Sequence, residues 1–254
     1  MTAERVEFRN AGGLNLVGDL SPGGNAAVVL CHGFTGDRHE DGRFDTLARS
    51  LNDDGLTVLA FDFAGSGESD DVPITVAGEV EDLRAALAFV RDRGAERIAV
   101  LGLSLGAEVA AHVSADEKIE ALVFWAPVTA PSSDPTVWYS REQLDELERT
   151  GLITWGKDTG PRRHVVIDGR HLDERRSLDR RTLLAGIRTP VLILHGSRDD
   201  LVPLEWSRTA LPLMPAGSEL RIVRGADHVF HKQLRRFIRP TRQWFRAWQY
   251  AARR

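Results

Sequence analysis

Short runs of apolar residues alternate along the chain with longer segments in which apolar residues recur every three or four positions. A short continuous apolar run is typical of a strand buried on both faces, and the longer spacing is typical of a helix with one buried face. Strands that alternate with helices predict a largely parallel sheet covered by helices on both faces. We expect its strands at residues 26–31, 56–61, 98–101, 121–125, 191–194 and 220–223.

Local signals predict further elements in the first part of the chain. Residues 6–9 and 14–19 flank the stretch 10–13, whose polar and glycine residues predict an antiparallel hairpin. Helical spacing predicts helices over 44–51 and 75–93, each of which ends shortly before a glycine.

The alternation is interrupted over residues 127–187, which we name the lid segment. Because this segment lies between two predicted strands of the sheet, we interpret it as an insertion that covers the sheet edge. The sequence therefore predicts a single domain over residues 1–254 that includes the lid segment. Prolines open the segment, namely Pro127, Pro131 and Pro135.

Two features predict structure inside the lid segment. Ser140 and Gln143 form a capping box, which predicts a helix that ends at Gly151. An apolar-rich patch over residues 164–172 is interpreted as two stretches around a turn at 168–169.

Composition excludes several classes of protein. Of the 254 residues, 42% are hydrophobic and 28% are charged, which is ordinary for a soluble globular chain. The net charge of −4 does not indicate a surface that binds nucleic acid. No stretch approaches the ~20 apolar residues of a membrane helix, and residues 1–10 lack the apolar run of a secretory signal. The lone Cys31 can form no intramolecular disulfide. We expect a cytoplasmic protein that binds neither nucleic acid nor membranes.

The stretch Gly102-Leu103-Ser104-Leu105-Gly106 carries the first chemical signal. It follows the predicted strand 98–101 and precedes a run that favours a helix. A G-x-S-x-G sequence in this context is a nucleophile elbow, a strained turn that lifts the serine hydroxyl off the sheet edge. A side chain at either glycine would clash where strand and helix approach. We therefore expect Ser104 to be a nucleophile.

A serine hydroxyl is a poor nucleophile unless a base removes its proton and a carboxylate orients that base. Among the eight histidines, His228 directly follows the last predicted strand, where a loop can carry it over the sheet edge. His231 is the alternative base, although it falls where the next helix should begin.

The orienting carboxylate has two candidates that spacing alone does not separate. Asp199 and Asp200 both follow the predicted strand 191–194. Asp227 is a weaker candidate, because it adjoins His228 and adjacent side chains rarely point at one another.

Acyl transfer also requires hydrogen-bond donors for the negative oxygen of the tetrahedral intermediate. We expect one donor in the backbone N–H of Leu105, which follows the nucleophile. The second is expected in the backbone N–H of Phe34, within residues 32–36, which we name the oxyanion loop. The polar residues that follow are interpreted as solvating this loop, namely Asp37, His39, Glu40 and Asp41.

Taken together, these motifs resemble those of serine α/β-hydrolases over nearly the whole chain. The resemblance implies the α/β-hydrolase fold, with a mostly parallel sheet, helices on both faces and an inserted lid. In that family the acid precedes a Val-Pro pair by three residues, which selects Asp199 as partner of Ser104 and His228. The loop 62–69 then has a structural role and helps to form the pocket floor. The matching stretches are 32–36, 62–69, 102–106, 195–203 and 225–228.

The first half is most similar to small cinnamoyl or feruloyl esterases, through residues 31–36 and 61–63. It departs from them at Leu103, where those esterases usually have His, and at Ala107, where many relatives carry a second Gly. The elbow serine argues against epoxide hydrolases and haloalkane dehalogenases, which use Asp there. Cys31 lies on the wrong strand for the nucleophile of a dienelactone hydrolase.

We therefore expect a serine carboxylic-ester hydrolase for small-molecule acyl esters, with no cofactor and no metal. Thioesterase, aminopeptidase-like, acyltransferase and perhydrolase reactions would use the same triad, and a non-catalytic binding protein of this fold is the alternative of another class. Three tryptophans in or beside the lid segment are expected either to wall the substrate site or to attach the lid segment to the body, namely Trp125, Trp138 and Trp155.

Aromatic residues alternate with arginines near the C-terminus. We expect the apolar face of this segment to pack on the sheet as the last helix, with its arginines outward, in preference to lying on a membrane surface. The arginine rim is also compatible with a homodimer. The aromatic residues are Phe237, Trp244, Phe245 and Trp248.

Overall fold

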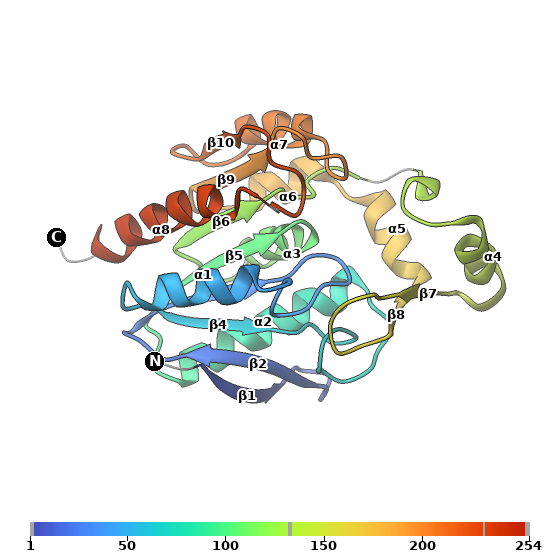
Figure 1. The fold of residues 1–254 in the computed structure, drawn as a ribbon, viewed down its shortest axis with the longest axis horizontal. Helices are drawn as coiled ribbons and strands as arrows, with labels where there is room; N and C mark the ends of the chain where they lie inside the picture. Colours follow the sequence, from blue (N-terminus) through green and yellow to red (C-terminus); the bar gives the residue numbers. More distant parts are fainter. Residues whose placement is uncertain (1–2, 132–133, 231, 252–254) are drawn as a thin grey trace.

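The computed structural model describes residues 3–131, 134–230 and 232–251. In this part of the chain an eight-stranded sheet has the strand order β1-β2-β4-β3-β5-β6-β9-β10 (Figure 1). β2 pairs antiparallel with β1 and with β4, and the other neighbouring strands are parallel. The strands are β1 (Glu4–Arg9), β2 (Asn15–Ser21), β3 (Ala26–Cys31), β4 (Thr57–Phe61), β5 (Arg97–Leu103), β6 (Ala121–Trp125), β9 (Val191–Gly196) and β10 (Glu219–Val223).

The predicted parallel sheet with helices on both faces is confirmed. Helices α1 and α8 cover the face that carries Val28 and Leu30, and α2, α3 and α6 cover the face that carries Val29 and Val100. The inner strands alternate their side chains between the two layers, so each layer has a largely apolar core. The helices are α1 (Arg43–Asn52), α2 (Val76–Asp92), α3 (Leu105–Val113), α6 (Arg180–Gly186), α7 (Leu204–Ala210), the short 3-10 turn η2 (Leu211–Leu213) and α8 (Leu234–Ala251).

The predicted last helix is confirmed as α8. Phe237, Phe245 and Trp248 are buried against the sheet, while Trp244 is half-buried at the edge of the same core. Arg239 and Arg246 are exposed. No helix in the described ranges is long and apolar enough to cross a membrane.

The lid segment runs between β6 and β9; its part before α6 lies beyond the carboxyl ends of the parallel strands (Figure 1), and α6 covers a face of the sheet. Its capping box at Ser140 and Gln143 is present, and the helix that it starts ends at Gly151 in the left-handed conformation, as predicted. The elements before α6 are η1 (Pro135–Val137), α4 (Arg141–Thr150), β7 (Leu152–Gly156), β8 (His164–Asp168) and α5 (Gly169–Ser177).

The interpretation of residues 168–169 as a turn is wrong. Asp168 is the N-cap of α5, and its carboxylate accepts a hydrogen bond from the backbone N–H of Arg170 at 2.9 Å. β8 therefore runs directly into a helix. The error arose because α5 buries His171 and Arg175 besides Leu172, so its sequence lacks the apolar spacing of an amphipathic helix.

Two buried contacts attach the lid segment to the body. Ile74, which precedes α2, pairs with Ile167 of β8, and its N–H donates to the Val166 carbonyl at 2.8 Å. The guanidinium of Arg175 on α5 forms an ion pair with Glu108 on α3, and both side chains are almost completely buried. Burial raises the pKa of the Glu108 carboxyl, against the opposing charge of Arg175.

Candidate active site

The elbow at Ser104 has the strained geometry that the motif predicts. Ser104 joins β5 to α3 with φ 53° and ψ −113°, a backbone conformation that non-glycine residues rarely adopt. A Cβ at Gly102 would lie 2.4 Å from the Gly106 carbonyl oxygen, and one at Gly106 would lie 2.4 Å from the carbonyl oxygen of the buried Cys31. Both glycines are therefore required by close backbone approach.

Backbone hydrogen bonds hold this strained turn in place. The Ser104 N–H donates to the Trp125 carbonyl at 2.8 Å, and the Ser104 carbonyl accepts from Val128 at 3.2 Å. The end of β6 thus supports the elbow. The Ser104 hydroxyl makes no capping bond to α3, and its side chain lines a pocket.

Asp199 and His228 lie within hydrogen-bond distance, with 2.9 Å between Asp199 Oδ2 and His228 Nδ1. The other carboxylate oxygen of Asp199 accepts from the backbone N–H groups of Leu201 and Val202 at 3.1 and 2.8 Å. Asp200 is exposed instead. Burial acts to raise the pKa of Asp199, but hydrogen bonds from two histidines and from Val202, with the charge of His228, hold it well below its ordinary value.

The second of these histidines, His195, was missed by the sequence analysis as part of the site. It is fully buried, and its Nε2 lies 3.2 Å from Asp199 Oδ2 and 3.0 Å from the Val202 carbonyl. Its Nδ1 lies 2.7 Å from the Ser207 hydroxyl, so Nε2 is the donor and Nδ1 the acceptor. His195 therefore fixes the carboxylate from behind. The one sequence signal for this contact was that His195 precedes Asp199 by four residues in the same matching stretch.

The loop that carries His228 reaches back across the sheet toward the elbow. Phe230 packs edge-on against Trp125, with 5.5 Å between ring centroids. Since the Trp125 carbonyl also binds the Ser104 N–H, one residue contacts both the elbow and the histidine loop. The alternative base His231 lies outside the described residues.

The oxyanion loop lies directly beside Ser104. A Cβ at Gly33 would lie 3.5 Å from the Ser104 Cβ. The Gly33 carbonyl accepts from the Gly36 N–H at 2.9 Å and from His32 Nδ1 at 2.8 Å, while His32 Nε2 accepts from the Phe63 N–H at 3.2 Å. Because a peptide is planar and trans, fixing the Gly33 carbonyl also fixes the direction of the Phe34 N–H.

Leu105 supplies the other expected donor. As the first residue of α3, its backbone N–H has no acceptor inside the helix. The helix N-terminus also carries a partial positive charge, which favours a negative oxygen at this point.

The interpretation of the polar residues after the oxyanion loop as solvating is wrong for two of them. Glu40 is buried, and its Oε1 accepts from the Gly33 N–H at 2.7 Å, while Oε2 accepts from Arg43 at 2.8 Å. Asp37 is also buried. Glu40 holds the start of the oxyanion loop, a contact that sequence spacing does not reveal.

The loop 62–69 is structural, but it does not form the pocket floor. The buried carboxylate of Asp62 binds the Arg38 backbone N–H at 2.6 Å and the Arg38 guanidinium. A Cβ at Gly67 would lie 2.0 Å from the Asp62 carboxyl carbon, so only glycine fits there. None of the described residues of this loop lines the pocket at Ser104.

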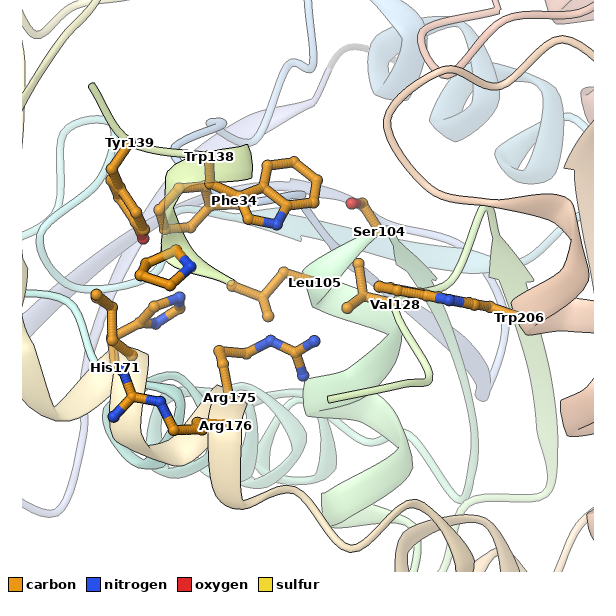
Figure 2. A pocket seen from close by; sticks show the side chains of 12 residues that line it. Phe34, Ser104, Leu105, Val128, Trp138, Tyr139, His171, Arg175, Arg176 and Trp206 are labelled. Carbon is orange, nitrogen blue, oxygen red and sulfur yellow. The ribbon is translucent and has the colours of Figure 1, made fainter. Parts of the chain in front are cut away.

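The pocket at Ser104 is largely apolar and has a cavity volume of about 70 Å³. Figure 2 shows aromatic side chains on one side of it and the polar side chains of α5 on the other. Besides Ser104, it is lined by Phe34, Leu105, Val128, Pro135, Trp138, Tyr139, His171, Leu172, Arg175, Arg176 and Trp206.

The three tryptophans named from sequence have different positions. Trp138 lines the pocket, whereas Trp155 lies edge-on to Phe34 at 5.6 Å and is not a lining residue. Trp125 is fully buried in the core, where its Nε1 donates to Thr241 at 3.0 Å. The substrate-wall interpretation is therefore wrong for Trp125, because every side chain of β6 is covered by one of the two helical layers.

His171 is a pocket residue that the sequence analysis did not identify. Its ring stacks on Phe34 with 5.1 Å between centroids and an interplanar angle of 22°. Burial, together with the nearby charge of Arg175, lowers the pKa of His171 to about 3. His171 and Arg175 are four residues apart on α5, so they share one helix face.

Within the described ranges, no group of three or more His, Cys, Asp or Glu residues could hold a metal ion. The polar groups at this site are a strained serine, a carboxylate–imidazole pair and backbone N–H donors. This set can support nucleophilic attack on an acyl carbon and proton transfer.

Residues 28–239 match the model of the alpha/beta hydrolase family. An uncharacterized protein of Mycobacterium tuberculosis is 30% identical over 233 residues, which cover 87% of this chain and 72% of that protein. The 2,6-dihydropseudooxynicotine hydrolase of Paenarthrobacter nicotinovorans is 28% identical over 231 residues, which cover 83% of this chain and 54% of that enzyme.

Among solved structures, Est1E from Butyrivibrio proteoclasticus with bound ferulic acid has a TM-score of 0.78 at 20% identity, covering 94% of this chain and 97% of that chain. At this identity the likeness shows the fold alone. The resemblance that the motifs indicated is confirmed by the family match, which spans most of the chain. The chain belongs to the alpha/beta hydrolase family.

Proposed function

We propose that the protein is a serine carboxylic-ester hydrolase with Ser104 as nucleophile, His228 as base and Asp199 as orienting acid. The observation that carries this proposal is the strained Ser104 elbow on the same sheet edge as the hydrogen-bonded Asp199–His228 pair. The chain order of these residues is the order of α/β-hydrolases.

In the proposed reaction the Ser104 oxygen attacks the ester carbonyl carbon while His228 takes the hydroxyl proton. The carbonyl electron pair moves onto its oxygen, which the N–H groups of Phe34 and Leu105 bind. The intermediate then expels the alcohol, which receives the proton from His228 and leaves an acyl-enzyme. Water attacks this acyl-enzyme with His228 again as base, the bond to the Ser104 oxygen breaks, and the carboxylic acid leaves while His228 returns the proton to Ser104.

Asp199 has two tasks in this scheme. Its hydrogen bond occupies His228 Nδ1, so that Nε2 is the nitrogen left to take the proton, and its charge stabilises the imidazolium that forms. Because the pKa of Asp199 is held low, the carboxylate stays ionised throughout the neutral range. His195 keeps that carboxylate in place.

The apolar lining and limited volume of the pocket favour a small acyl group. Trp138 and Tyr139 form one wall, while Trp155 supports Phe34 from outside the pocket. The ferulic acid held by Est1E makes methyl ferulate a reasonable probe besides short aliphatic esters.

The same residues would serve thioester hydrolysis, aminopeptidase-like cleavage, acyl transfer or perhydrolysis. The pocket favours none of these over ester hydrolysis. A non-catalytic binding protein is disfavoured, because such a protein has no need of the strained elbow and the buried Asp199–His228 pair together.

The test compares initial rates of wild type and Ser104→Ala on p-nitrophenyl esters from acetate to decanoate and on methyl ferulate. We expect turnover by wild type with a short-chain optimum, and a loss of at least about a thousandfold in the variant. A folded wild type that hydrolyses none of these esters would contradict the proposal, as would full activity in Ser104→Ala.

A further inference from the structure

We propose that Lys157 of the lid segment is a positioning residue that holds the oxyanion loop in its working geometry. This inference rests on the proposed function, since it concerns the loop that supplies the Phe34 N–H. Lys157 acts through the loop backbone and does not touch the reacting atoms.

The contact joins the lid segment directly to the oxyanion loop. Lys157 follows β7 and is half-buried, and its ammonium donates to the Thr35 carbonyl and to the Gly36 carbonyl, the latter at 3.4 Å. The Lys157 backbone N–H donates to the Arg163 carbonyl at 2.9 Å, which anchors the lysine on the β7–β8 hairpin. Figure 1 shows this hairpin folding back toward the body of the molecule.

The oxyanion loop needs such support because its turn is strained. The Gly36 N–H donates to the Gly33 carbonyl at 2.9 Å, which closes a four-residue turn. Thr35, at the third position, has φ 57°, a value that a type II turn requires and that glycine or asparagine normally supplies. A β-branched residue is disfavoured there. Two hydrogen bonds from one ammonium to this turn offset part of that strain.

Other contacts of the hairpin fall on the same loop. The Trp155 ring of β7 lies edge-on to the Phe34 ring at 5.6 Å. A Cβ at Gly160 would lie 2.6 Å from an Asp37 carboxylate oxygen, so the hairpin tip is in close contact with the residue after the loop. On its other side the hairpin is held by Arg162, which binds Asp71.

These contacts help to set the direction of the expected donor. The Gly33 carbonyl and the Phe34 N–H belong to one planar peptide, and the Gly33 carbonyl is held by the Gly36 N–H and by His32 Nδ1. The Gly36 N–H shares a second planar peptide with the Thr35 carbonyl, which Lys157 binds. Without the ammonium this second peptide can turn, so the Gly33 carbonyl loses one of its two partners and the Phe34 N–H shifts from the position that a tetrahedral oxyanion requires.

The first experiment measures kcat and KM of Lys157→Met, Lys157→Arg and Lys118→Met on the p-nitrophenyl ester that wild type hydrolyses fastest. Lys118 is the matched control, because its side chain is 82% exposed and forms an ion pair with Glu120 at the surface. Losing a whole oxyanion donor lowers kcat by about 10²- to 10³-fold, so a displaced donor should cost about tenfold. We expect that loss in Lys157→Met with KM nearly unchanged, recovery in Lys157→Arg and no change in Lys118→Met.

A second experiment measures the rate at which a fluorophosphonate labels Ser104, together with the thermal midpoint of each variant. The phosphoryl oxygen uses the same donors, so labelling of Lys157→Met should slow about as much as kcat falls. An unchanged labelling rate and kcat in a folded Lys157→Met would overturn the role of Lys157 alone. A rise in KM without a fall in kcat would also overturn it, because that pattern indicates a role in binding substrate.

The two proposals fail in different ways. If wild type shows no ester turnover but labels at Ser104, the substrate class is wrong and the labelling rates still decide the role of Lys157. If wild type neither hydrolyses esters nor labels at Ser104, the proposed function and this inference are both overturned.

Discussion

At the scale of single residues, the site contains buried side chains whose protonation depends on their neighbours. Asp199 is completely buried yet remains a carboxylate, because it receives hydrogen bonds from two histidines and two backbone N–H groups. His171 shows the opposite case. It is equally shielded, but the only charged neighbour that shifts its pKa is the cationic Arg175, so its neutral form is favoured.

The lowered pKa of His171 predicts a loss of stability in weak acid. Between the unfolded pKa near 6.5 and the folded value of about 3, the unfolded chain binds a proton that the folded chain does not, so the free energy of unfolding falls as pH falls. From pH 7 to pH 5 this contribution is about 2 kcal/mol. His171→Phe keeps an aromatic ring against Phe34 and removes the titration.

Urea unfolding of wild type and His171→Phe at pH 7 and pH 5 measures this effect. We expect the stability difference between the two proteins to shift in favour of the variant by about 2 kcal/mol at the lower pH. A difference that is the same at both pH values would show that His171 is protonated as readily in the folded chain as in the unfolded chain.

At the scale of elements, helix α5 connects the lid segment to α3, the helix that follows Ser104. Both side chains of the ion pair between Arg175 and Glu108 are buried, and Arg175 also donates to the Ala130 carbonyl at 2.6 Å. A buried ion pair adds little net stability, but removing one partner leaves an uncompensated charge. The position of α5 therefore depends on keeping both residues or neither.

Arg175→Met is expected to destabilise the protein by about 3 kcal/mol, whereas Arg175→Met combined with Glu108→Leu should recover most of that loss. Arg176→Met is the control, because Arg176 is exposed and its ion pair is with the exposed Asp173, so its loss should change stability by less than about 0.5 kcal/mol. Denaturant unfolding at pH 7 gives all three values. Equal stabilities of the single and double variants would show that Glu108 needs no partner.

How much of the fold was predictable also depends on the element. The strands of the sheet were predictable because their apolar runs need only local sequence to be recognised, and β3 and β6 have the predicted bounds. The sequence did not predict β7, β8 and α5 as separate elements, because their buried positions are few and include charged residues. Their conformation is set by contacts with α3 and with Ile74, which lie far away in the sequence.

The candidate site divides in the same way. Ser104, Asp199 and His228 could be named because each follows a recognisable strand and the family order selects among them. Glu40 and His195 could not be assigned, because their roles come from burial against the oxyanion loop and against Asp199. Trp125 was misplaced because the sequence does not show that the last side chain of β6 lies on the sheet face that α8 covers.

At the scale of the whole molecule, the last helix, α8, supports the histidine loop that directly precedes it in the chain. Phe230, two residues after His228, stacks on Phe237 of α8 with 3.8 Å between ring centroids and packs edge-on against Trp125. Phe230 itself has φ 57°, so the loop holds a conformation that its sequence alone does not favour. Packing by α8 therefore maintains the shape of this loop.

Phe237→Ala should affect both stability and catalysis. The side chain is fully buried, so its truncation should lower the free energy of unfolding by about 3–5 kcal/mol. Because Phe230 loses its stacking partner, we also expect kcat at 15 °C to fall more than KM changes. Denaturant unfolding and ester kinetics on the same preparation test both parts. Unchanged kcat in a destabilised variant would show that the loop keeps its shape without α8.

The single cysteine of the chain, Cys31, lies where β3 meets the oxyanion loop, and its backbone carbonyl lies against Gly106, the glycine that lets α3 approach. Burial raises the pKa of the Cys31 thiol well above its ordinary value, so in the folded chain it is both covered and un-ionised. A thiol in that state reacts with alkylating reagents only after β3 and α3 separate. The alkylation rate of Cys31 therefore reports how often β3 and α3 separate beneath Ser104.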